Sequence, residues 1–333
     1  MAFSPRTLGA PSKFRLWHPQ QLDGLFRFQS FVADPRLRFL AMVLPTGAGK
    51  SLLAWSFAAM TGLRTLVLTA NRYLEKQYVE DFEGHHLTDI QGQQNYKCLA
   101  LEPGGILQRY SGGVRGQMCD QGPCHQGVYC KLMQGGCVYY DKLREAAAED
   151  LTVCSNYSKW ISHGKALRSG RVEEEPIGSF DVLVCDEAHE AAAQVTKALT
   201  VSLWEDELRR FASASLPAQS AEAQDWAVWA QKQIPFMEEM LTEFHREVSK
   251  IGLTGATTES MRALKRLLEA LDQLAGMDGD WVLTRDGKRV VAEAVSPKRH
   301  CEGLLYREIE KVVLMGATLT EKDVEELGAG GNR

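Results

Sequence analysis

The fold of this 333-residue chain follows from one stretch, Leu44-Pro45-Thr46-Gly47-Ala48-Gly49-Lys50-Ser51. An apolar run over residues 39–44 leads into it, and residues 52–58 after it repeat apolar side chains with the period of a helix. A glycine-rich turn between a strand and a helix is the setting that a phosphate-binding loop requires. The two glycines let backbone N–H groups turn towards phosphate oxygens, the lysine adds a positive charge, and the serine hydroxyl can hold Mg²⁺. Leucine stands at the first position, where the usual pattern has glycine.

A second stretch, Asp186-Glu187-Ala188-His189, ends another apolar run over residues 182–185. We expect the acidic pair at the carboxyl end of a strand that lies beside the strand of residues 39–44. There Asp186 would reach the metal, and Glu187 would orient or deprotonate an attacking water. By itself, an acidic pair after a strand is more often a solvated strand end. Together, in this order and context, the two stretches predict an NTP-hydrolysing site in an α/β fold.

Composition bounds the kind of protein. The length predicts two or more domains, and 44% hydrophobic residues are enough for packed cores. The formal net charge of −5 gives no overall basic footprint, although a motor protein can confine its Lys and Arg side chains to one groove. No apolar stretch approaches the roughly 18 residues of a membrane span, and the first residues lack the apolar core of a signal peptide. We therefore predict a cytoplasmic protein with no membrane partner.

Five of the eight cysteines lie in a segment that is rich in Gly and Gln and poor in periodicity: Cys98, Cys119, Cys124, Cys130 and Cys137. A loop of this length does not easily bury a core, so thiolates bound to a metal centre would supply the missing cross-links. Zinc modules usually have closely spaced cysteine pairs, whereas the last four cysteines here follow the pattern C-x4-C-x5-C-x6-C. Wider spacing suits an iron–sulfur cluster held by four thiolates. The spacing alone leaves zinc, an iron–sulfur cluster and unrelated buried cysteines open.

Further short segments occur in order around these sites. They are Phe14-Arg15-Leu16-Trp17-His18-Pro19-Gln20-Gln21, Thr65-Leu66-Val67-Leu68-Thr69-Ala70-Asn71-Arg72, Asn95-Tyr96-Lys97-Cys98, Gly136-Cys137-Val138-Tyr139-Tyr140, Val153-Cys154-Ser155-Asn156-Tyr157 and Met315-Gly316-Ala317-Thr318-Leu319-Thr320. Several of them are weak signals when taken singly. In this order, and with the cysteines between the Lys50 loop and the Asp186 stretch, the chain resembles the first motor domain of superfamily-two iron–sulfur DNA helicases of the DinG and XPD type. The resemblance covers most of the chain.

The resemblance implies a RecA-like, parallel-sheet P-loop NTPase motor domain with a cysteine-rich iron–sulfur insertion and a helical, arch-like insertion. The expected parts are the first part of the motor with the phosphate-binding loop (1–90), the cysteine-rich insertion (91–150), the middle of the motor with the DEAH box (151–195), the helical insertion (196–280) and the last part of the motor with the coupling motif (281–333).

Within the helical insertion, residues 203–211, 226–248 and 260–274 place apolar side chains at helical spacing. Residues 281–292 follow the pattern of two strands around an Asp-Gly turn, which we expect to return the chain to the motor sheet. Two arrangements remain open for these helices: an arch over a DNA strand, or a bundle that only supports the motor domain.

The resemblance also assigns site residues. It implies ATP with its adenine at Gln20 or Gln21 and its phosphates at the loop residues Thr46, Gly47, Ala48, Gly49, Lys50 and Ser51. Mg²⁺ would be held by Ser51 and Asp186, and His189 would link the ATP site to the coupling motif at Gly316-Ala317-Thr318. A [4Fe–4S] cluster would be held by Cys98, Cys124, Cys130 and Cys137. Cys119 would be the spare cysteine, or would replace one of the middle pair.

The function implied is that of an ATP-dependent DNA helicase subunit that travels 5′→3′ on single-stranded or forked DNA. Such a helicase needs a second motor domain that supplies an arginine finger, and no Gln-x-x-Gly-Arg segment occurs in this chain. We expect that domain on a separate chain or a longer polypeptide, and slow ATP hydrolysis by this chain alone. The alternative is an ATP-binding, single-stranded-DNA-binding module without helicase turnover. Scattered residues fit DNA contacts: Arg72, Lys76, Arg109, Arg115, Lys131, Tyr139 and Tyr140.

Overall fold

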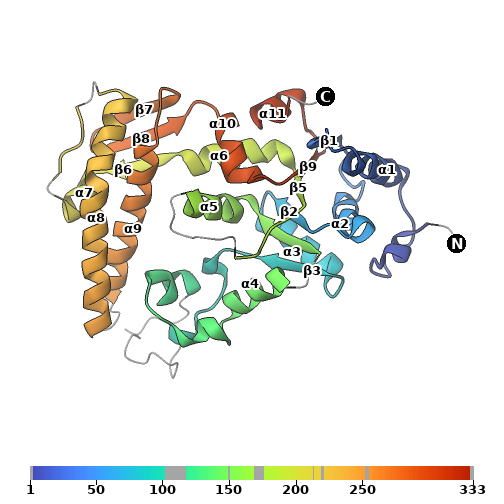
Figure 1. The fold of residues 1–333 in the computed structure, drawn as a ribbon, viewed down its shortest axis with the longest axis horizontal. Coiled ribbons are helices and arrows are strands. Elements are labelled where there is room, and N and C mark those ends of the chain that lie inside the picture. The colour runs from blue at the N-terminus through green and yellow to red at the C-terminus, as the bar shows by residue number, and fades with distance from the viewer. Residues whose placement is uncertain are drawn as a thin grey trace. The chain divides into compact units, whose positions relative to one another are not determined.

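The structure is a computed structural model that describes residues 3–101, 118–148, 151–168, 176–212, 214–218, 221–251 and 255–330. The chain forms two compact units (Figure 1). The first unit comprises residues 1–91, 142–198 and 296–333, and the second unit comprises residues 92–141 and 199–295. Both units are therefore assembled from segments that are far apart in the sequence.

The first unit is built on a six-stranded parallel sheet with the strand order β1-β9-β5-β2-β4-β3. The strands are β1 (Phe39–Val43), β2 (Thr65–Thr69), β3 (Leu87–Ile90), β4 (Thr152–Asn156), β5 (Val182–Asp186) and β9 (Lys311–Gly316). Every residue of β2, β5 and β9 is buried, which is typical of parallel strands covered on both faces. The predicted α/β fold with a parallel sheet is confirmed.

Helices pack around this sheet: α1 (Pro19–Ala33), α2 (Lys50–Thr61), α3 (Arg72–Phe82), α4 (Val138–Ala148), α5 (Tyr157–Arg168), α6 (Ala191–Leu199), α10 (Lys298–Cys301) and α11 (Glu321–Glu326). Stacked aromatic rings join the first three helices. Phe28 of α1 lies on Phe57 of α2 with ring centroids 3.9 Å apart, and Trp55 of α2 lies on Phe82 of α3 at 5.3 Å. These contacts hold α2, the helix that follows the glycine-rich turn, between α1 and α3.

The strand order corrects one expectation about the site. We expected β5 beside β1, but β9 lies between them and pairs with both. Val43 of β1 is in register with Gly316 of β9, and Met315 of β9 is in register with Asp186 of β5. All three strands are parallel, so their carboxyl ends meet at one edge of the sheet. The glycine-rich turn, the coupling motif and the acidic pair therefore still converge, with the coupling motif in the middle.

Lys311, the first residue of β9, is a buried cation that ties the sheet to α1. Its Nζ donates to the carbonyl oxygens of Phe31 (3.2 Å), Asp34 (2.7 Å) and Leu37 (2.6 Å), at and just beyond the carboxyl end of α1. The last carbonyls of a helix have no partner within the helix, and the ammonium group supplies three donors. The contact fixes α1 against the strand that runs to the coupling motif.

The second unit contains a three-stranded antiparallel sheet, β6-β8-β7. Its strands are β6 (Val201–Trp204), β7 (Trp281–Asp286) and β8 (Arg289–Ala294). The Asp-Gly turn is confirmed, with Gly287 at φ 56°. The expectation that this hairpin joins the motor sheet is wrong, because it pairs with β6 instead. Burial alternates along β6 and β8, a pattern that suits a sheet with one covered face and not the interior of a parallel sheet.

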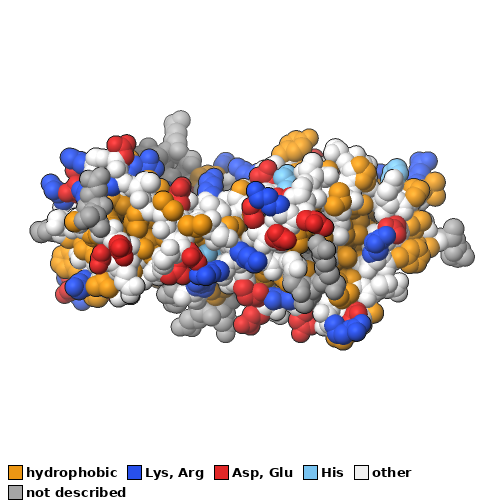
Figure 2. Space-filling view, turned by 90° about the horizontal axis from the view of Figure 1, so that it is seen from above, with side chains coloured by type: hydrophobic (Ala, Val, Ile, Leu, Met, Phe, Trp, Pro, Cys, Tyr) orange, Lys and Arg blue, Asp and Glu red, His pale blue; other side chains and the backbone are white. Residues whose placement is uncertain are grey.

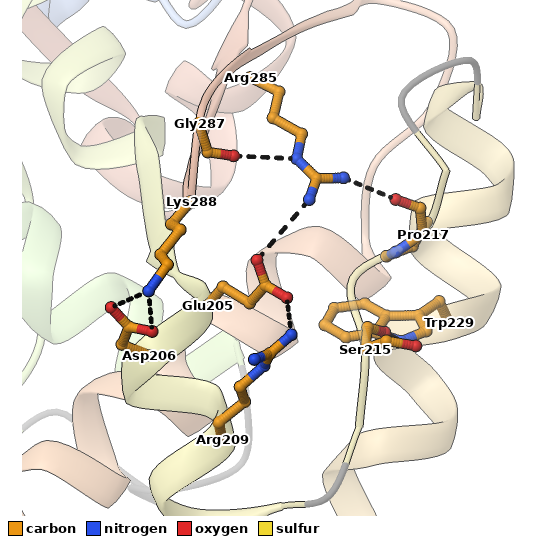
Figure 3. Close-up of polar contacts among 9 residues, drawn as sticks. All are labelled: Glu205, Asp206, Arg209, Ser215, Pro217, Trp229, Arg285, Gly287 and Lys288. Carbon is orange, nitrogen blue, oxygen red and sulfur yellow. Dashed lines mark hydrogen bonds and ion pairs between the residues drawn. The ribbon is translucent and has the colours of Figure 1, made fainter.

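The predicted helices of the second unit are confirmed as α7 (Glu205–Phe211), α8 (Ala223–Ile251) and α9 (Gly255–Ala275), although residues 203 and 204 belong to strand β6. Figure 3 shows how α7 is held to the hairpin. Glu205 lies at the start of α7, 2.6 Å from Arg209 Nη2 and 3.7 Å from Arg285 Nη2, and Lys288 pairs with Asp206 at 2.9 Å. Acidic residues in the first turn are also favoured by the helix dipole.

The cysteine-rich segment packs on the long helices α8 and α9, which lie side by side (Figure 1). Arg262 Nη2 donates to Asp120 Oδ2 at 3.1 Å, and Lys265 Nζ donates to the carbonyl oxygen of His125 at 2.6 Å. His245 Nε2 lies 2.7 Å from the carbonyl oxygen of Gln126. The cysteine-rich and helical insertions, expected as separate parts, thus fall in one unit, and this unit also includes residues 281–295. Among the described residues, no helix has both the length and the apolar character needed to cross a membrane.

Candidate active site and cysteine cluster

The glycine-rich turn between β1 and α2 adopts a conformation that requires its glycines. Gly47 and Gly49 have φ angles of 80° and 73°, in the left-handed region that side chains with a Cβ rarely adopt. A Cβ on Gly49 would also lie 2.2 Å from Gln21 Nε2, far inside contact distance. The turn leads directly into the first turn of α2, which begins with Lys50 and Ser51. This is the arrangement in which backbone N–H groups and a helix start face an anion.

Gln21 braces this turn from α1. Its side chain is buried, and Nε2 donates to the carbonyl oxygens of Ala48 (2.9 Å) and Gly49 (3.2 Å). Its Oε1 accepts from the backbone N–H of His18 at 2.9 Å. Of the two glutamines expected at the adenine, Gln21 is thus bonded to backbone groups, whereas Gln20 is exposed.

The lysine and the acidic pair meet at the carboxyl edge of the sheet. Lys50 Nζ lies 3.0 Å from Glu187 Oε1. Asp186 is 4% exposed; its Oδ1 accepts from the backbone N–H of Glu187 and its Oδ2 from the hydroxyl of Tyr78, both at 3.0 Å. Burial raises the pKa of Asp186 to about 6, opposed by the Tyr78 hydrogen bond and the Lys50 charge and assisted by the Glu187 charge. The site therefore concentrates one cation and two carboxylates against the glycine-rich turn.

Glu187 and His189 connect this group to β9. Glu187 has φ 50° and ψ 51°, a left-handed conformation that costs free energy for a residue with a Cβ and is typical of functional sites. His189 Nδ1 lies 3.6 Å from Glu187 Oε2. At the end of β9, a Cβ on Gly316 would lie 3.5 Å from His189 Nδ1. The structure thus brings His189, the acidic pair and the start of the coupling motif together.

Two tyrosines that we did not assign to the site hold Asp186 in place. Tyr78 of α3 donates to its carboxylate, and the Tyr157 hydroxyl donates to its backbone carbonyl at 3.0 Å. Both tyrosine side chains are fully buried. The sequence signal was present, since a buried tyrosine hydroxyl normally needs a partner. For Tyr78 that partner is Asp186, 108 residues further along the chain, and only the tertiary structure identifies it.

The donor set fits a nucleotide and Mg²⁺. Backbone N–H groups at the left-handed glycines suit phosphate oxygens, and Lys50 supplies a point charge. Ser51 is in the first turn of α2, and the enclosed Asp186 carboxylate is an oxygen ligand of the kind Mg²⁺ prefers.

A second buried carboxyl, Glu75 of α3, lies near the site. Its Oε2 accepts from Asn156 Nδ2 at 3.1 Å, while its Oε1 is buried without a hydrogen-bond partner. Burial raises its pKa from 4.5 to about 7; the Asn156 hydrogen bond lowers it and the nearby Asp89 charge raises it. This carboxyl therefore keeps its proton in the folded protein at a pH where the unfolded chain has lost it.

Because of Glu75, the free energy of unfolding should fall as the pH rises. The stabilisation that the protonated Glu75 carboxyl contributes is complete below pH 4.5 and is lost as the pH rises through 7. Replacing Glu75 by Gln keeps an acceptor for Asn156 and removes the titration. We expect Glu75→Gln to exceed the wild type in unfolding free energy at pH 8 by on the order of 3 kcal/mol, with the two converging near pH 5.

Urea unfolding between pH 5 and 8 measures this difference. Glu80→Gln is the matched control, because Glu80 lies exposed on the same helix, 3.3 Å from Lys76. Parallel pH curves for wild type and Glu75→Gln would contradict the assignment.

The five cysteines of the cysteine-rich segment converge in the second unit. Cys119 is 1% exposed, its thiol donates to the carbonyl oxygen of Lys97 at 3.4 Å, and neighbouring Cys98, burial and neighbouring Cys137 raise its pKa; Cys98, Cys130 and Cys137 are also buried. Burial raises the pKa of Cys124 to about 11, with added effects of Cys130, Cys137 and Cys98. A Cβ on Gly122 would lie 2.8 Å from the Cys98 sulfur, so the chain closes tightly around it. Cys154, Cys185 and Cys301 are buried elsewhere, in the first unit.

Convergence of thiols fits a metal–thiolate centre, because a cation would relieve the cost of placing several thiolates together. The described residues nevertheless contain no group of three or more His, Cys, Asp and Glu side chains in a metal-binding arrangement. The expected ligands Cys98, Cys124, Cys130 and Cys137 remain a prediction. Position does not mark Cys119 as the spare, since it contacts two of those four. His125 is exposed and hydrogen-bonds Gln93.

The candidate DNA contacts divide by exposure. Arg72, Lys76 and Lys131 are exposed, and Arg109 and Arg115 lie outside the described residues. Tyr139 is buried with its ring centroid 5.4 Å from that of Tyr96, so it is no surface for stacking bases.

Exposed aromatic residues outside this set of candidates include Tyr73, 80% exposed beside Arg72, and Tyr129, 66% exposed. Basic and acidic side chains are mixed on the face shown in Figure 2, in keeping with a net charge of −5.

The turn, the lysine and the acidic pair at the carboxyl edge of a parallel sheet define a P-loop NTPase motor domain. The chain belongs to the family described as Type III restriction enzyme, res subunit (ResIII), whose model matches residues 17–215, more than half of the chain. Fold and family together make it a superfamily-two helicase motor domain, a class that uses ATP and Mg²⁺.

Solved structures support the fold. A structure described as an XPD helicase matches with a TM-score of 0.56 and 15% identity, covering 95% of this chain and 61% of its own. A structure described as a truncated XPD matches with a TM-score of 0.57 and 14% identity, covering 95% and 97%. The present chain thus spans 61% of the length of the first relative. No curated protein matches the sequence significantly.

Proposed function

We propose that this chain is the first motor domain of an ATP-dependent iron–sulfur DNA helicase that travels 5′→3′ on single-stranded DNA. The observation that carries the proposal is the convergence of Lys50, Asp186 and Glu187 beside the glycine-rich turn, with Lys50 Nζ 3.0 Å from Glu187 Oε1. The convergence of five thiols in the second unit and the exposed Arg72 and Tyr73 support the cluster and the nucleic-acid partner.

The residues have separate roles in hydrolysis. The turn binds the β- and γ-phosphates through its N–H groups, and Lys50 exchanges Glu187 for phosphate oxygens. Glu187, released from the ion pair, orients the attacking water and accepts its proton. Ser51 and Asp186 would hold Mg²⁺, which would offset the negative charge of the phosphates. His189, between Glu187 and Gly316, relates the state of the site to the coupling motif.

Full turnover in the proposal requires a second motor domain, on the same polypeptide or on another chain. Such a domain supplies an arginine that stabilises the charge of the transition state, and a comparable arginine contributes roughly 10³–10⁵ in rate in GTPases. The 333 residues alone are then expected to bind ATP and to hydrolyse it slowly.

The alternative function is an ATP-binding module that holds single-stranded DNA without helicase turnover. In this function Glu187 would serve only as the ion-pair partner of Lys50. The two functions differ in whether Glu187 acts on water or only on Lys50.

The test is ATP binding and hydrolysis by the anaerobically purified chain, with and without single-stranded DNA, for wild type and Glu187→Gln. We expect Glu187→Gln to bind ATP within about threefold of wild type and to lose at least about tenfold in turnover. Glu326→Gln removes a carboxylate of α11 that lies 3.5 Å from Lys322, and it should match the wild type. If Glu187→Gln hydrolyses ATP at the same rate as the control variant, the result supports the binding module. If the wild type binds no ATP, the helicase motor and the binding module are both overturned.

A further inference from the structure

Helix α3 begins at the surface, and Tyr78, in its second half, contacts the buried Asp186. Asn71 caps its start, with Oδ1 accepting from the N–H groups of Tyr73 (3.0 Å) and Leu74 (3.1 Å). The cap fixes the first turn, from which Arg72 and the 80%-exposed Tyr73 face solvent. A cation beside an exposed aromatic ring suits a phosphate and a base of single-stranded nucleic acid.

Further along the same helix, Tyr78 fixes the orientation of Asp186. Its hydroxyl donates to Oδ2 at 3.0 Å, while Oδ1 is held by the N–H of Glu187 at the same distance. Tyr78 is 1% exposed, so water does not readily replace this hydrogen bond. With one donor on each oxygen, the plane of the carboxylate is determined, and so is the direction of the lone pairs that remain for a cation.

A second pair of contacts joins α3 to the strand next to β2. Glu75 of α3 accepts from Asn156 at the end of β4, and the following residue, Tyr157, donates to the backbone carbonyl of Asp186. Asp186 is therefore held from α3 through its side chain and from the β4–α5 junction through its backbone. The side-chain contact belongs to α3 alone, so we expect a shift of α3 to act on the carboxylate of Asp186 before it acts on the backbone of β5.

We propose that Tyr78 is a positioning residue that transmits the position of α3 to Asp186, so that single-stranded DNA bound at Arg72 and Tyr73 alters Mg²⁺-dependent nucleotide affinity. This inference rests on the proposed function and adds the route by which the nucleic acid acts on the site. A helix of 11 residues is about 16 Å long and moves as a rigid rod, so a displacement at its exposed end reaches Tyr78.

The coupling has a thermodynamic consequence that does not depend on turnover. If DNA raises nucleotide affinity by a given factor, the nucleotide raises DNA affinity by the same factor. Coupling between two sites of one protein is typically about 5- to 150-fold. The hydroxyl of Tyr78 is a single hydrogen bond to a charged group, and its loss should remove most of a coupling at the lower end of that range.

The experiment measures affinity for a fluorescent ATP analogue with and without Mg²⁺ and with and without an oligo-dT 20-mer, using the full chain. For the wild type we expect Mg²⁺ to tighten binding and the oligonucleotide to tighten it again by at least about fivefold. Tyr78→Phe should retain Mg²⁺-free affinity, lose most of the Mg²⁺ effect and respond to oligo-dT by less than about twofold.

Two further variants separate positioning from folding. Tyr306→Phe removes another buried hydroxyl, which donates to the Leu327 carbonyl at 2.7 Å, and should leave both effects unchanged. Tyr73→Ala changes an exposed side chain and should keep the Mg²⁺ effect while losing the oligo-dT effect. If Mg²⁺ and oligo-dT change the nucleotide affinity of Tyr78→Phe as they do in the wild type, the inference is overturned. It is also overturned if Tyr306→Phe loses these two effects to the same extent as Tyr78→Phe. A wild type that shows no Mg²⁺-dependent nucleotide binding would instead overturn the proposed function.

Discussion

Replacing Lys50 by alanine should raise the dissociation constant for Mg²⁺–ATP by at least about 100-fold, equivalent to about 2.7 kcal/mol. Lys50 stands at the first position of α2, directly after Gly49, and its ammonium group is the cation of the site that contacts the acidic pair. It pairs with Glu187 at 3.0 Å. Without it, the β- and γ-phosphates lose the positive side chain that faces them and lie opposite a Glu187 carboxylate that has lost its ion-pair partner, so the variant loses attraction and gains repulsion.

Equilibrium titration with a fluorescent ATP analogue measures this loss. Lys322→Ala is the matched control, because Lys322 lies exposed on α11, 3.5 Å from Glu326, and should bind the nucleotide as the wild type does. Thermal unfolding of both variants shows whether the fold is retained. Unchanged nucleotide affinity in Lys50→Ala would mean that the glycine-rich turn is not the phosphate site.

Replacing Cys98 by serine should remove most of the iron bound by the anaerobically purified chain, to less than about a tenth of the wild-type content, since four thiolates hold such a cluster. Cys98 is buried, raises the pKa of the neighbouring Cys119, and has its sulfur 2.8 Å from where a Cβ on Gly122 would lie, so its thiol is one of the convergent group. Serine has a similar shape but is a harder, weaker ligand for iron. Iron and acid-labile sulfide per chain, with the visible absorption spectrum, measure the outcome.

Serine variants of the other cysteines decide which four bind. Cys124→Ser, Cys130→Ser and Cys137→Ser should behave as Cys98→Ser does, while Cys119→Ser keeps its iron if it is the spare. Cys301→Ser is the control for a buried thiol outside the segment, because its sulfur donates only to the Pro297 carbonyl at 3.4 Å. If the purified wild type contains zinc and no iron, the segment holds a zinc site and not an iron–sulfur cluster. A full cluster in Cys98→Ser would exclude that residue as a ligand.

Much of the active site was predictable because its requirements are local. A left-handed backbone at positions 47 and 49 admits glycine with the least strain, and the lysine and serine must follow at once to face the same phosphates. The strand before and the helix after the turn were evident from apolar periodicity, and both appear, as β1 and α2. The acidic pair was recognisable for the same reason, at the end of an apolar run that forms β5.

The errors concern relations between distant segments. Buried parallel strands have similar apolar runs, so nothing local shows that β9 separates β1 from β5. The hairpin of β7 and β8 was recognised by its turn. Its partner strand, β6, ends at Trp204, 77 residues before β7 begins at Trp281. Tyr139 looked like a surface aromatic beside the cysteines and is instead packed on Tyr96.

The sequence by itself determined the local parts of this protein: a glycine-rich turn between a strand and a helix, an acidic pair at a strand end, a cysteine-rich segment and their order, because each depends on residue types at short and fixed spacing. The tertiary structure decided how these parts act on one another. It placed Gly316 against His189, Gln21 on the turn and the Tyr78 hydroxyl on Asp186. Such contacts depend on strand order and helix packing, which arise from burying many apolar side chains at once and leave little trace in any single segment.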